Sequence, residues 1–162
     1  MDPVRVNFVC LGNICRSPLA DALLRHIAMQ RGVSDRVVVA SRGVGRWHLG
    51  ERADPRMRST ATSHGVEIDG VAELFVRSDY DDFDLILTMD ADRQRDILGR
   101  APDAHAHKVL PFRTFDPLGG PDDDVPDPYY GGHQGFEDVF SMVGRTCDSL
   151  LDRILDGTWR EA

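Results

Sequence analysis

The chain has 162 residues and a formal net charge of −8, with 41% hydrophobic and 28% charged residues. This length fits one domain with a buried core, and the negative charge argues against nonspecific binding to nucleic acid or an anionic membrane. No apolar run is long enough to span a bilayer, and MDPVRVNF does not have the pattern of a signal peptide. We therefore expect a cytoplasmic protein that forms a single domain over residues 1–162.

Taken in chain order, the apolar residues predict alternating strands and helices. The expected elements are a strand at 5–10, a helix from Ser17 to Gly32, a strand at 36–41, a helix at 54–65, a strand at 84–90, a helix at 90–100, a strand at 107–112 and a helix at 136–157. Such alternation implies right-handed crossovers and a parallel sheet covered by helices on both faces. Ligands of these sheets bind beyond the carboxyl ends of the strands.

Several helix boundaries rest on residues that favour helix ends. Pro18 lies in the first turn of the first helix, where its missing N–H costs little. Asp54 is expected to cap the second helix, with Pro55 at its first position, and Gly157 is expected to end the last one. Residues 113–135 are rich in Asp, Pro and Gly and have no periodicity, which predicts a long loop. Loops of this length are usually functional or disordered.

The three cysteines, Cys10, Cys15 and Cys147, cannot all pair with one another, and nothing in the sequence indicates secretion. They are therefore expected to be reduced thiols rather than a disulfide framework. Cys147 lies on the apolar stripe of the last predicted helix and is expected to belong to the core.

A cysteine at the end of the first strand begins the most informative motif. The stretch CLGNICRS places Cys10 and Arg16 at the two ends of a C-x5-R loop that leads into a helix. If the loop curls around a tetrahedral dianion, its N–H groups point inward and the helix adds the positive end of its dipole. Gly12 and Asn13 tolerate the positive φ that this requires. Arg16 offers a planar fork to two phosphate oxygens. The same field favours a Cys10 thiolate, to which Ser17 could donate a hydrogen bond.

Two stretches, CLGNICRSP from Cys10 and DPYYG from Asp127, resemble those of the low-molecular-weight protein tyrosine phosphatases, particularly the bacterial members. The resemblance runs over nearly the whole chain. Further matches occur, in order, at Ser41, Trp47–His48, Asp54–Arg56, His64–Gly65 and Met89–Asp90. The C-x5-R spacing alone is a weak signal, but joined to NICRS and a distant DPYY inside a matching α/β pattern it is specific.

The resemblance implies a three-layer α/β domain whose four-stranded parallel sheet has the strand order 2-1-3-4 and helices on both faces. It also implies metal-independent hydrolysis of phosphotyrosine in proteins. Cys10 would attack phosphorus and form a cysteinyl-phosphate, while Asp127 would protonate the leaving phenolate and then deprotonate the attacking water. Phosphate would be bound by Arg16 and by the loop residues Leu11, Gly12, Asn13, Ile14, Cys15 and Ser17. No metal or cofactor is expected, because the loop supplies the positive charge.

Four more residues gain a role through the resemblance. Trp47, Tyr129 and Tyr130 would form the walls of the substrate cleft, although the tyrosines could also be ordinary loop anchors. Cys15 could form a reversible disulfide with Cys10 that shields the nucleophile from over-oxidation. The alternative for Cys15 is a small side chain packed behind the loop.

The loop is also expected to need a supporting hydrogen-bond network, which the resemblance assigns to Asn13, Ser17, Ser41 and Asp90. Asp90 could equally be only the cap of the helix that follows it. The chain departs from the family pattern at Arg42, where many members have a small residue, and at Gly70, which occupies the place of a histidine that supports the loop asparagine. Our hypothesis is that Arg42 partly replaces this histidine or extends the field that attracts the anion.

Four other functions share parts of this pattern. An arsenate reductase needs further cysteines to relay a disulfide, and Cys147 is expected to be buried. Phosphoarginine phosphatases of this type carry threonine where this chain has Ile14. A phosphotyrosine-binding module without turnover would not need Cys10, Arg16 and Asp127 together, and a thiol redox protein would leave Arg16 and DPYY without a role. We therefore predict a phosphatase for phosphotyrosine-containing proteins, mostly a monomer or a weak homodimer, with no nucleic-acid or membrane partner.

Overall fold

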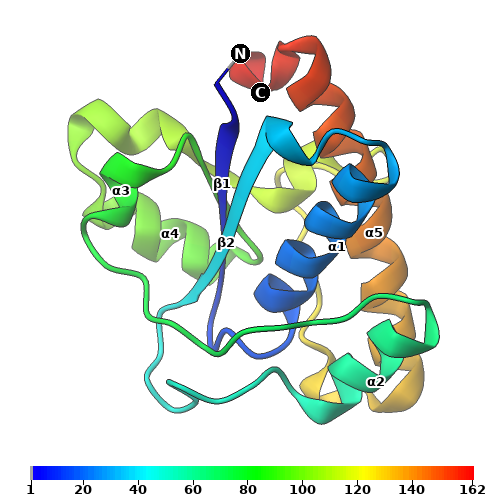
Figure 1. Cartoon of the computed structure of the whole chain (residues 1–162). Coiled ribbons are helices and arrows are strands. Elements are labelled where there is room, and N and C mark those ends of the chain that lie inside the picture. Colours follow the sequence, from blue (N-terminus) through cyan, green and yellow to red (C-terminus); the bar gives the residue numbers. More distant parts are fainter. Residues whose placement is uncertain (1) are drawn as a thin grey trace.

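A parallel sheet of four strands forms the centre of the molecule (Figure 1). The structure is a computed structural model that describes residues 2–162, except for the side chain of Tyr130. The strands are β1 (Val4–Cys10), β2 (Val37–Gly43), β3 (Leu85–Thr88) and β4 (Val109–Pro111). Their order is β2-β1-β3-β4 and all pairs are parallel, which confirms the predicted fold. Because β1 is central, Cys10 at its carboxyl end lies between the ends of β2 and β3.

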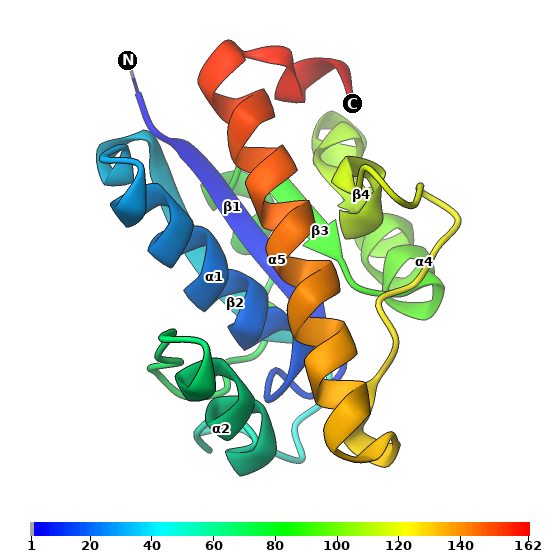
Figure 2. The same cartoon turned by 90° about the vertical axis from the view of Figure 1, so that its right-hand side faces the viewer.

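Helices cover the sheet on both faces. They are α1 (Arg16–Gln30), α2 (Pro55–Ser63), α3 (Asp79–Asp82), α4 (Ala91–Arg100) and α5 (Gly132–Asp156). Figures 1 and 2 show α1 and α5 side by side on one face, with α2 beside the first turns of α5, while α3 and α4 lie on the opposite face. The predicted three-layer arrangement is therefore present.

Alternation along β1 divides the core between these two faces. Val6 and Phe8 point toward α1 and α5, and the ring of Phe8 meets that of Phe112 edge to face at 5.3 Å. Val9 points the other way and packs with Ile97 of α4. All five side chains are fully buried. Burial of each such side chain stabilises the fold by about 1.5–3 kcal/mol, so β1 and the loop that leaves it rest on a firmly packed base.

The ends of α2 and α5 follow the predicted signals. Asp54 caps α2, since its carboxylate accepts a hydrogen bond from the Arg56 N–H at 2.8 Å. Gly157 ends α5 with φ at 82°, a left-handed conformation that glycine adopts without strain. Although α5 has 25 residues, neither it nor another helix among residues 2–162 is long and apolar enough to cross a membrane.

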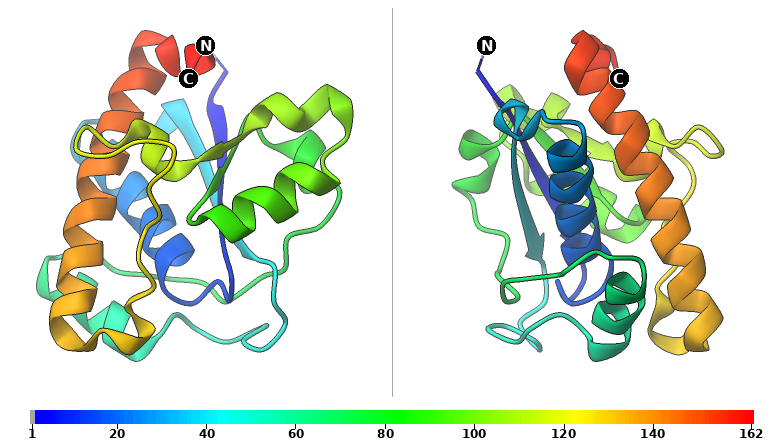
Figure 3. Two further views of the ribbon diagram at one scale, coloured as in Figure 1. Left: turned by 180° about the vertical axis from the view of Figure 1, so that it is seen from behind. Right: turned by 45° about the vertical axis from the view of Figure 1, so that its right-hand side comes forward.

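The region between β4 and α5 differs in detail from its prediction. The strand expected at 107–112 covers only Val109–Pro111, because residues 103–108 form 3-10 turns. The loop expected at 113–135 contains short 3-10 turns at Phe112–Phe115 and Pro128–Tyr130, and α5 begins at Gly132 rather than at Phe136. The first turn of α5 has no apolar side chain, so periodicity does not reveal it. Figure 3 shows the segment between these turns as an extended trace that runs from the sheet to the start of α5.

Candidate active site

The loop of residues 10–17, here the Cys10 loop, joins the end of β1 to the start of α1. β1 ends at Cys10, and α1 begins at Arg16. The helix N-cap residue, Cys15, makes no capping hydrogen bond with its side chain, so it does not occupy the N–H groups of the first helical turn. Free N–H groups and the positive end of the α1 dipole make this place suited to an anion.

The thiol of Cys10 lies within this loop and is almost fully buried, at 3% exposure. Its sulfur accepts a hydrogen bond from the Asn13 N–H at 3.3 Å and lies 2.9 Å from the hydroxyl oxygen of Ser17. Ser17 Oγ also accepts a hydrogen bond from the side-chain amide of Asn13 at 2.7 Å. Because that bond uses a lone pair of the oxygen, the Ser17 proton can point toward sulfur, as a thiolate requires.

Asn13 holds the Cys10 loop through both its backbone and its side chain. Its φ of 57° makes it the one residue other than glycine with positive φ among residues 2–162, and asparagine tolerates this conformation better than most side chains. The backbone N–H of Glu73 donates to Asn13 Oδ1 at 2.8 Å. This bond orients the amide so that Nδ2 faces Ser17. The support predicted for the loop asparagine therefore comes from a backbone N–H, a donor that no side-chain motif reveals.

Gly43, the last residue of β2, allows the sheet to approach the Cys10 loop closely. A Cβ atom at this position would lie 2.9 Å from Asn13 Cβ, 3.0 Å from Asn13 N and 3.0 Å from the carbonyl carbon of Gly12. Two of these three atoms belong to the backbone, so the loop itself would have to move. The end of β2 thus supports the loop only because residue 43 has no side chain.

Arg16 is buried beneath the site and fixed along one edge of its guanidinium group. Nη1 donates to Asp90 at 2.9 Å and to the carbonyl oxygen of Val125 at 3.0 Å, while Nη2 lies 3.9 Å from an Asp127 oxygen. Burial by itself lowers the pKa of Arg16, but the negative charges of Cys10, Asp90 and Asp127 outweigh it and raise this pKa.

Asp90 both orients Arg16 and caps α4, where it accepts a hydrogen bond from the Arg93 N–H. Both roles considered for Asp90 are therefore visible in the structure.

Most of the predicted site residues line one cleft of about 240 Å³. Its walls and floor come from Cys10, Leu11, Gly12, Ile14, Cys15, Arg16, Trp47, His48, Asp127 and Tyr129. Trp47 is 73% exposed and Tyr129 42%, so an incoming aromatic ring can reach both. Asn13, Ser17 and Asp90 lie behind this surface and act on it through hydrogen bonds. Tyr130 was also predicted to line the cleft, but its side chain lies outside the described part of the structure.

Asp127 reaches the cleft from the turn that precedes α5. Its carboxylate accepts a hydrogen bond from the Tyr129 N–H at 3.0 Å, and its side chain is 45% exposed. The acid and the nucleophile, far apart in the sequence, thus line the same cleft. An exposed carboxyl group at the mouth of an anion site can exchange protons both with a leaving group and with water.

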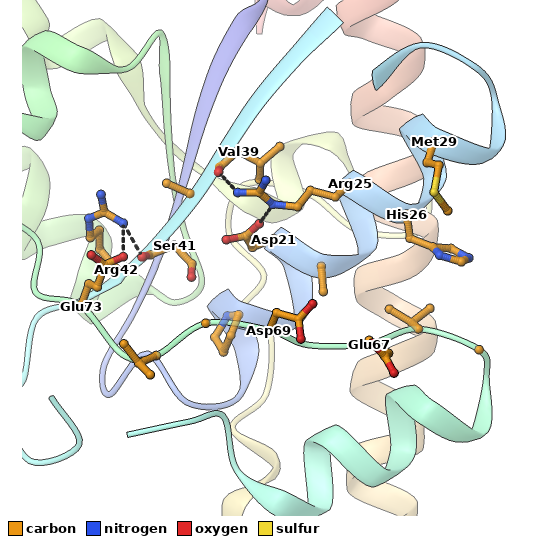
Figure 4. Close-up of a pocket in the computed structure, with 17 residues that line it drawn as sticks. Asp21, Arg25, His26, Met29, Val39, Ser41, Arg42, Glu67, Asp69 and Glu73 are labelled. Carbon is orange, nitrogen blue, oxygen red and sulfur yellow. Dashed lines mark hydrogen bonds and ion pairs between the residues drawn. The ribbon is translucent and has the colours of Figure 1, made fainter. Parts of the chain in front are cut away.

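Ser41 is placed differently from the prediction. It lies on β2 and lines a second, larger groove of about 790 Å³ together with Asp21 of α1 and Glu73 (Figure 4). The hydroxyl group of Ser17 lies 3.4 Å from the carbonyl oxygen of Arg42, the residue after Ser41 on β2. The carbonyl oxygen of Ser41 accepts a hydrogen bond from the Arg42 guanidinium at 2.9 Å. The end of β2 thus meets Ser17 through a backbone carbonyl, while the Ser41 side chain lies on the groove.

Arg42 borders this larger groove and forms ion pairs with acidic groups rather than facing the cleft. Nη1 lies 3.2 Å from the Glu73 carboxylate and Nε lies 3.7 Å from that of Asp79 (Figure 4 shows the first contact). Glu73 is also the residue whose N–H holds Asn13. The side chain of Arg42 is therefore linked to the Cys10 loop through the segment that contains Glu73. It does not face the cleft as an added positive charge.

The two other cysteines differ in their relation to the cleft. Cys15 lines it, and burial together with the negative charges of Asp54 and Cys10 raises the pKa of its thiol. Cys147 is completely buried between α5 and α1, where its sulfur donates to the carbonyl oxygen of Ala20. This confirms that Cys147 belongs to the core. All three cysteines are free thiols, so a Cys10–Cys15 disulfide stays a prediction.

The family model for low molecular weight phosphotyrosine protein phosphatases matches residues 5–158. The chain belongs to this family. Its relatives include the low molecular weight protein-tyrosine-phosphatase of Streptomyces coelicolor, which is 44% identical over 91% of this chain and 91% of its own. These relatives are named as protein-tyrosine phosphatases, a class of hydrolase, which agrees with the function expected from the sequence.

Solved structures of the phosphatase family have the same fold. A protein tyrosine phosphatase from Entamoeba histolytica superposes with a TM-score of 0.91 at 34% identity, covering 96% of this chain and 99% of that one. The YwlE arginine phosphatase superposes with a TM-score of 0.83 at 24% identity, covering 93% of this chain and 95% of that one. At that identity the likeness to YwlE shows the fold alone.

Three contributions to this phosphatase site were missed from the sequence. His48 lines the cleft, and its Nδ1 lies 2.6 Å from a Glu51 carboxylate oxygen, whereas the sequence indicates the Trp47–His48 pair only as a family match. The carbonyl oxygen of Val125 fixes Arg16, and the N–H of Glu73 fixes Asn13. Backbone groups have no residue-type signal, so only the fold could identify the last two.

Proposed function

We propose that this chain hydrolyses phosphotyrosine in proteins through a cysteinyl-phosphate intermediate. The observation that carries the proposal is the placement of the Cys10 thiol, which lies beside two hydrogen-bond donors in a cleft that also contains Arg16 and Asp127. A cysteine becomes a nucleophile when its thiolate is stabilised in this way. Hydrolysis then needs an anion site, a nucleophile and a proton donor at one place, and the cleft contains one of each.

In the first step, the Cys10 thiolate attacks phosphorus, so that an S–P bond forms while the P–O bond to the tyrosine oxygen breaks. Asp127, in its protonated form, gives its proton to the departing phenolate. Arg16 and the N–H groups of the Cys10 loop stabilise the charge on the three equatorial oxygens, which is the main requirement in phosphoryl transfer. This charge comes from the protein itself, and these steps involve no metal.

In the second step, water attacks the phosphorus atom of the cysteinyl-phosphate. Asp127, now a carboxylate, takes a proton from this water, the S–P bond breaks, and inorganic phosphate and the Cys10 thiolate are released. Ser17 donates its hydrogen bond to the sulfur again as the negative charge returns to it. Since Asp127 regains the proton that it gave away, the site is restored after each turnover.

The shape of the cleft supports an aryl ester as the substrate. Trp47 and Tyr129 offer aromatic surface on its rim, and apolar Ile14 lies on its wall. An aryl ring can stack on these groups, whereas the guanidinium of phosphoarginine would gain little from Ile14. Disulfide relay by an arsenate reductase is disfavoured because Cys147 is buried in the core. A cytoplasmic protein that acts on phosphoproteins, as a monomer or a weak homodimer, remains part of this proposal.

A comparison of wild type, Cys10→Ser and Asp127→Ala tests the proposal, with an aryl phosphate as substrate in buffer that contains a chelator. Wild type is expected to be active. Cys10→Ser should lose activity by roughly 10⁴-fold or more, as removal of a nucleophile does in other enzymes. Asp127→Ala should lose about 10²- to 10⁴-fold with phenyl phosphate, and far less with dinitrophenyl phosphate, whose leaving group needs no proton. Activity that disappears with the chelator, or persists in Cys10→Ser, would contradict the mechanism.

A further inference from the structure

Arg56, in the first turn of α2, connects two parts of the site that are distant in the sequence. Its Nε and Nη2 donate to the two carboxylate oxygens of Asp54 at 3.1 and 2.9 Å. Its remaining terminal nitrogen, Nη1, donates to the carbonyl oxygen of Tyr129 at 3.0 Å. One guanidinium group thus bonds a residue next to the Cys10 loop on one side and the turn that carries Asp127 on the other.

Two aromatic rings also contact the guanidinium group. Its central carbon lies 4.8 Å from the ring centre of Tyr129 and 4.8 Å from that of Phe136 in α5. Contacts of this kind between a cation and a ring face are attractive and favour one orientation of the guanidinium plane. Only arginine combines a planar face for stacking with a fork for a carboxylate and a further N–H for a carbonyl. The position is therefore specific for arginine and not merely for a positive charge.

Asp54, the partner of Arg56, is itself fixed to the Cys10 loop. Its backbone N–H donates to the carbonyl oxygen of Ile14 at 2.8 Å, and its side chain is 6% exposed. A continuous series of bonds therefore leads from Ile14 through Asp54 and Arg56 to Tyr129. Since Tyr129 donates to the Asp127 carboxylate, the series ends at the proposed acid.

The turn that carries Asp127, residues 126–131, lies at the mouth of the cleft. The Asp127 carboxylate is 45% exposed, and its distance of 3.9 Å from Arg16 Nη2 is longer than a hydrogen bond. The bond from Arg56 reaches the backbone two residues away. We propose that Arg56 is a positioning residue that holds Asp127 at proton-transfer distance from the leaving group. This inference rests on the proposed function, in which Asp127 is the general acid.

The test uses Arg56→Ala and Arg56→Lys, with kcat/KM measured for phenyl phosphate and for dinitrophenyl phosphate. A displaced acid slows only the departure of the poor leaving group, because dinitrophenolate leaves without a proton. We expect Arg56→Ala to lower kcat/KM for phenyl phosphate by about 10- to 100-fold, which is the scale of a misplacement of about 1 Å, and to change kcat/KM for the dinitrophenyl ester by less than about threefold. Arg56→Lys, which keeps the charge but has no fork, should behave like Arg56→Ala.

Arg58→Ala is the matched control, because Arg58 lies on the same helix, carries the same charge and donates to the carbonyl oxygen of Ala53. It should leave the ratio of the two kcat/KM values as in wild type. Thermal melting of every variant separates loss of fold from loss of position, and Arg56→Lys carries the test if Arg56→Ala does not fold. An equal loss with both esters, or no loss with either, would overturn the role of Arg56. If Asp127→Ala itself shows no selective loss with phenyl phosphate, the assignment of the acid fails instead.

Discussion

The Cys10 loop and the turn that carries Asp127 face each other across one cleft, but they are held in very different ways. The Cys10 loop is buried, and its thiol, hydroxyl, amide and guanidinium groups each make at least one short hydrogen bond. The turn at residues 126–131 lies on the surface, with Asp127 half exposed and fixed by one hydrogen bond from its own turn and by the bond of Arg56 to Tyr129.

The difference follows from the task of each part. Donors that stabilise a transition state must already point at the developing charge, because any reorientation would cost energy during the reaction. The Cys10 loop is therefore built into the sheet and α1. A general acid must exchange protons with the leaving group and with water, so the Asp127 carboxylate has to remain accessible. The bond from Arg56 reaches the backbone of this turn and leaves the carboxylate itself open.

Among changes outside the reacting groups, the strongest loss of activity is expected where the Cys10 loop contacts the sheet. Gly43→Ala should lower kcat/KM by about 100-fold, because the new Cβ would displace the backbone of Gly12 and Asn13 and with it the N–H that faces Cys10. The loss should be similar for phenyl and dinitrophenyl phosphate, unlike the loss from Arg56→Ala, since the anion site serves both esters.

Gly120→Ala provides the matched control for this change. A Cβ at Gly120 meets nothing within 4 Å, and its φ is not positive, so its activity should equal that of wild type. If Gly43→Ala retains full activity, β2 does not hold the Cys10 loop rigidly. The Cys10 loop and the turn at residues 126–131 would then not differ in how firmly they are held.

An intermediate effect is expected at the base of the long loop that leads to Asp127. Burial by itself raises the pKa of Asp116, but hydrogen bonds from Arg145, the Leu118 N–H and Arg113 outweigh it and lower this pKa to about 2. Arg113 also donates to the carbonyl oxygen of Asp124, so this cluster anchors the loop. A carboxyl group whose pKa falls on folding stabilises the protein above its unfolded pKa of about 4, and here by about 2 kcal/mol.

This contribution should be lost as the pH falls from about 4 to about 2. The free energy of unfolding, measured with urea for wild type and Asp116→Asn, should therefore differ most at neutral pH, and the difference should shrink toward pH 2. A difference that is independent of pH would show that the charge of Asp116 does not stabilise the base of the loop.

The smallest effect is expected for Arg42→Ala. The side chain of Arg42 is linked to the Cys10 loop through the segment of Glu73, and its pair with the exposed Glu73 carboxylate should contribute at most about 1 kcal/mol. We expect kcat to fall by about two- to fivefold, while Arg77→Ala, a change at an exposed arginine, should leave it unchanged. If kcat and KM of Arg42→Ala both equal those of wild type, Arg42 neither replaces the missing histidine nor attracts the anion.

Much of this site could be predicted because its chemistry depends on residue types at fixed spacing. Cys10 and Arg16 belong to one continuous loop, and the change from a period of two to a period of 3.6 shows that this loop joins a strand to a helix. Asp127 was found through DPYY, since two prolines around an acidic residue leave a recognisable pattern. Ser41 was assigned to the loop network by resemblance, but a strand position alone does not say which side it faces.

The reacting groups follow from the order of the residues alone: a thiol, a guanidinium and a carboxyl group in an α/β chain with a parallel sheet. The contacts that hold these groups in place become visible only in the folded chain. The N–H of Glu73, the carbonyl oxygens of Val125 and Tyr129, and the close approach at Gly43 are backbone features. Every residue has the same backbone groups, so their partners depend on which segments the fold brings together.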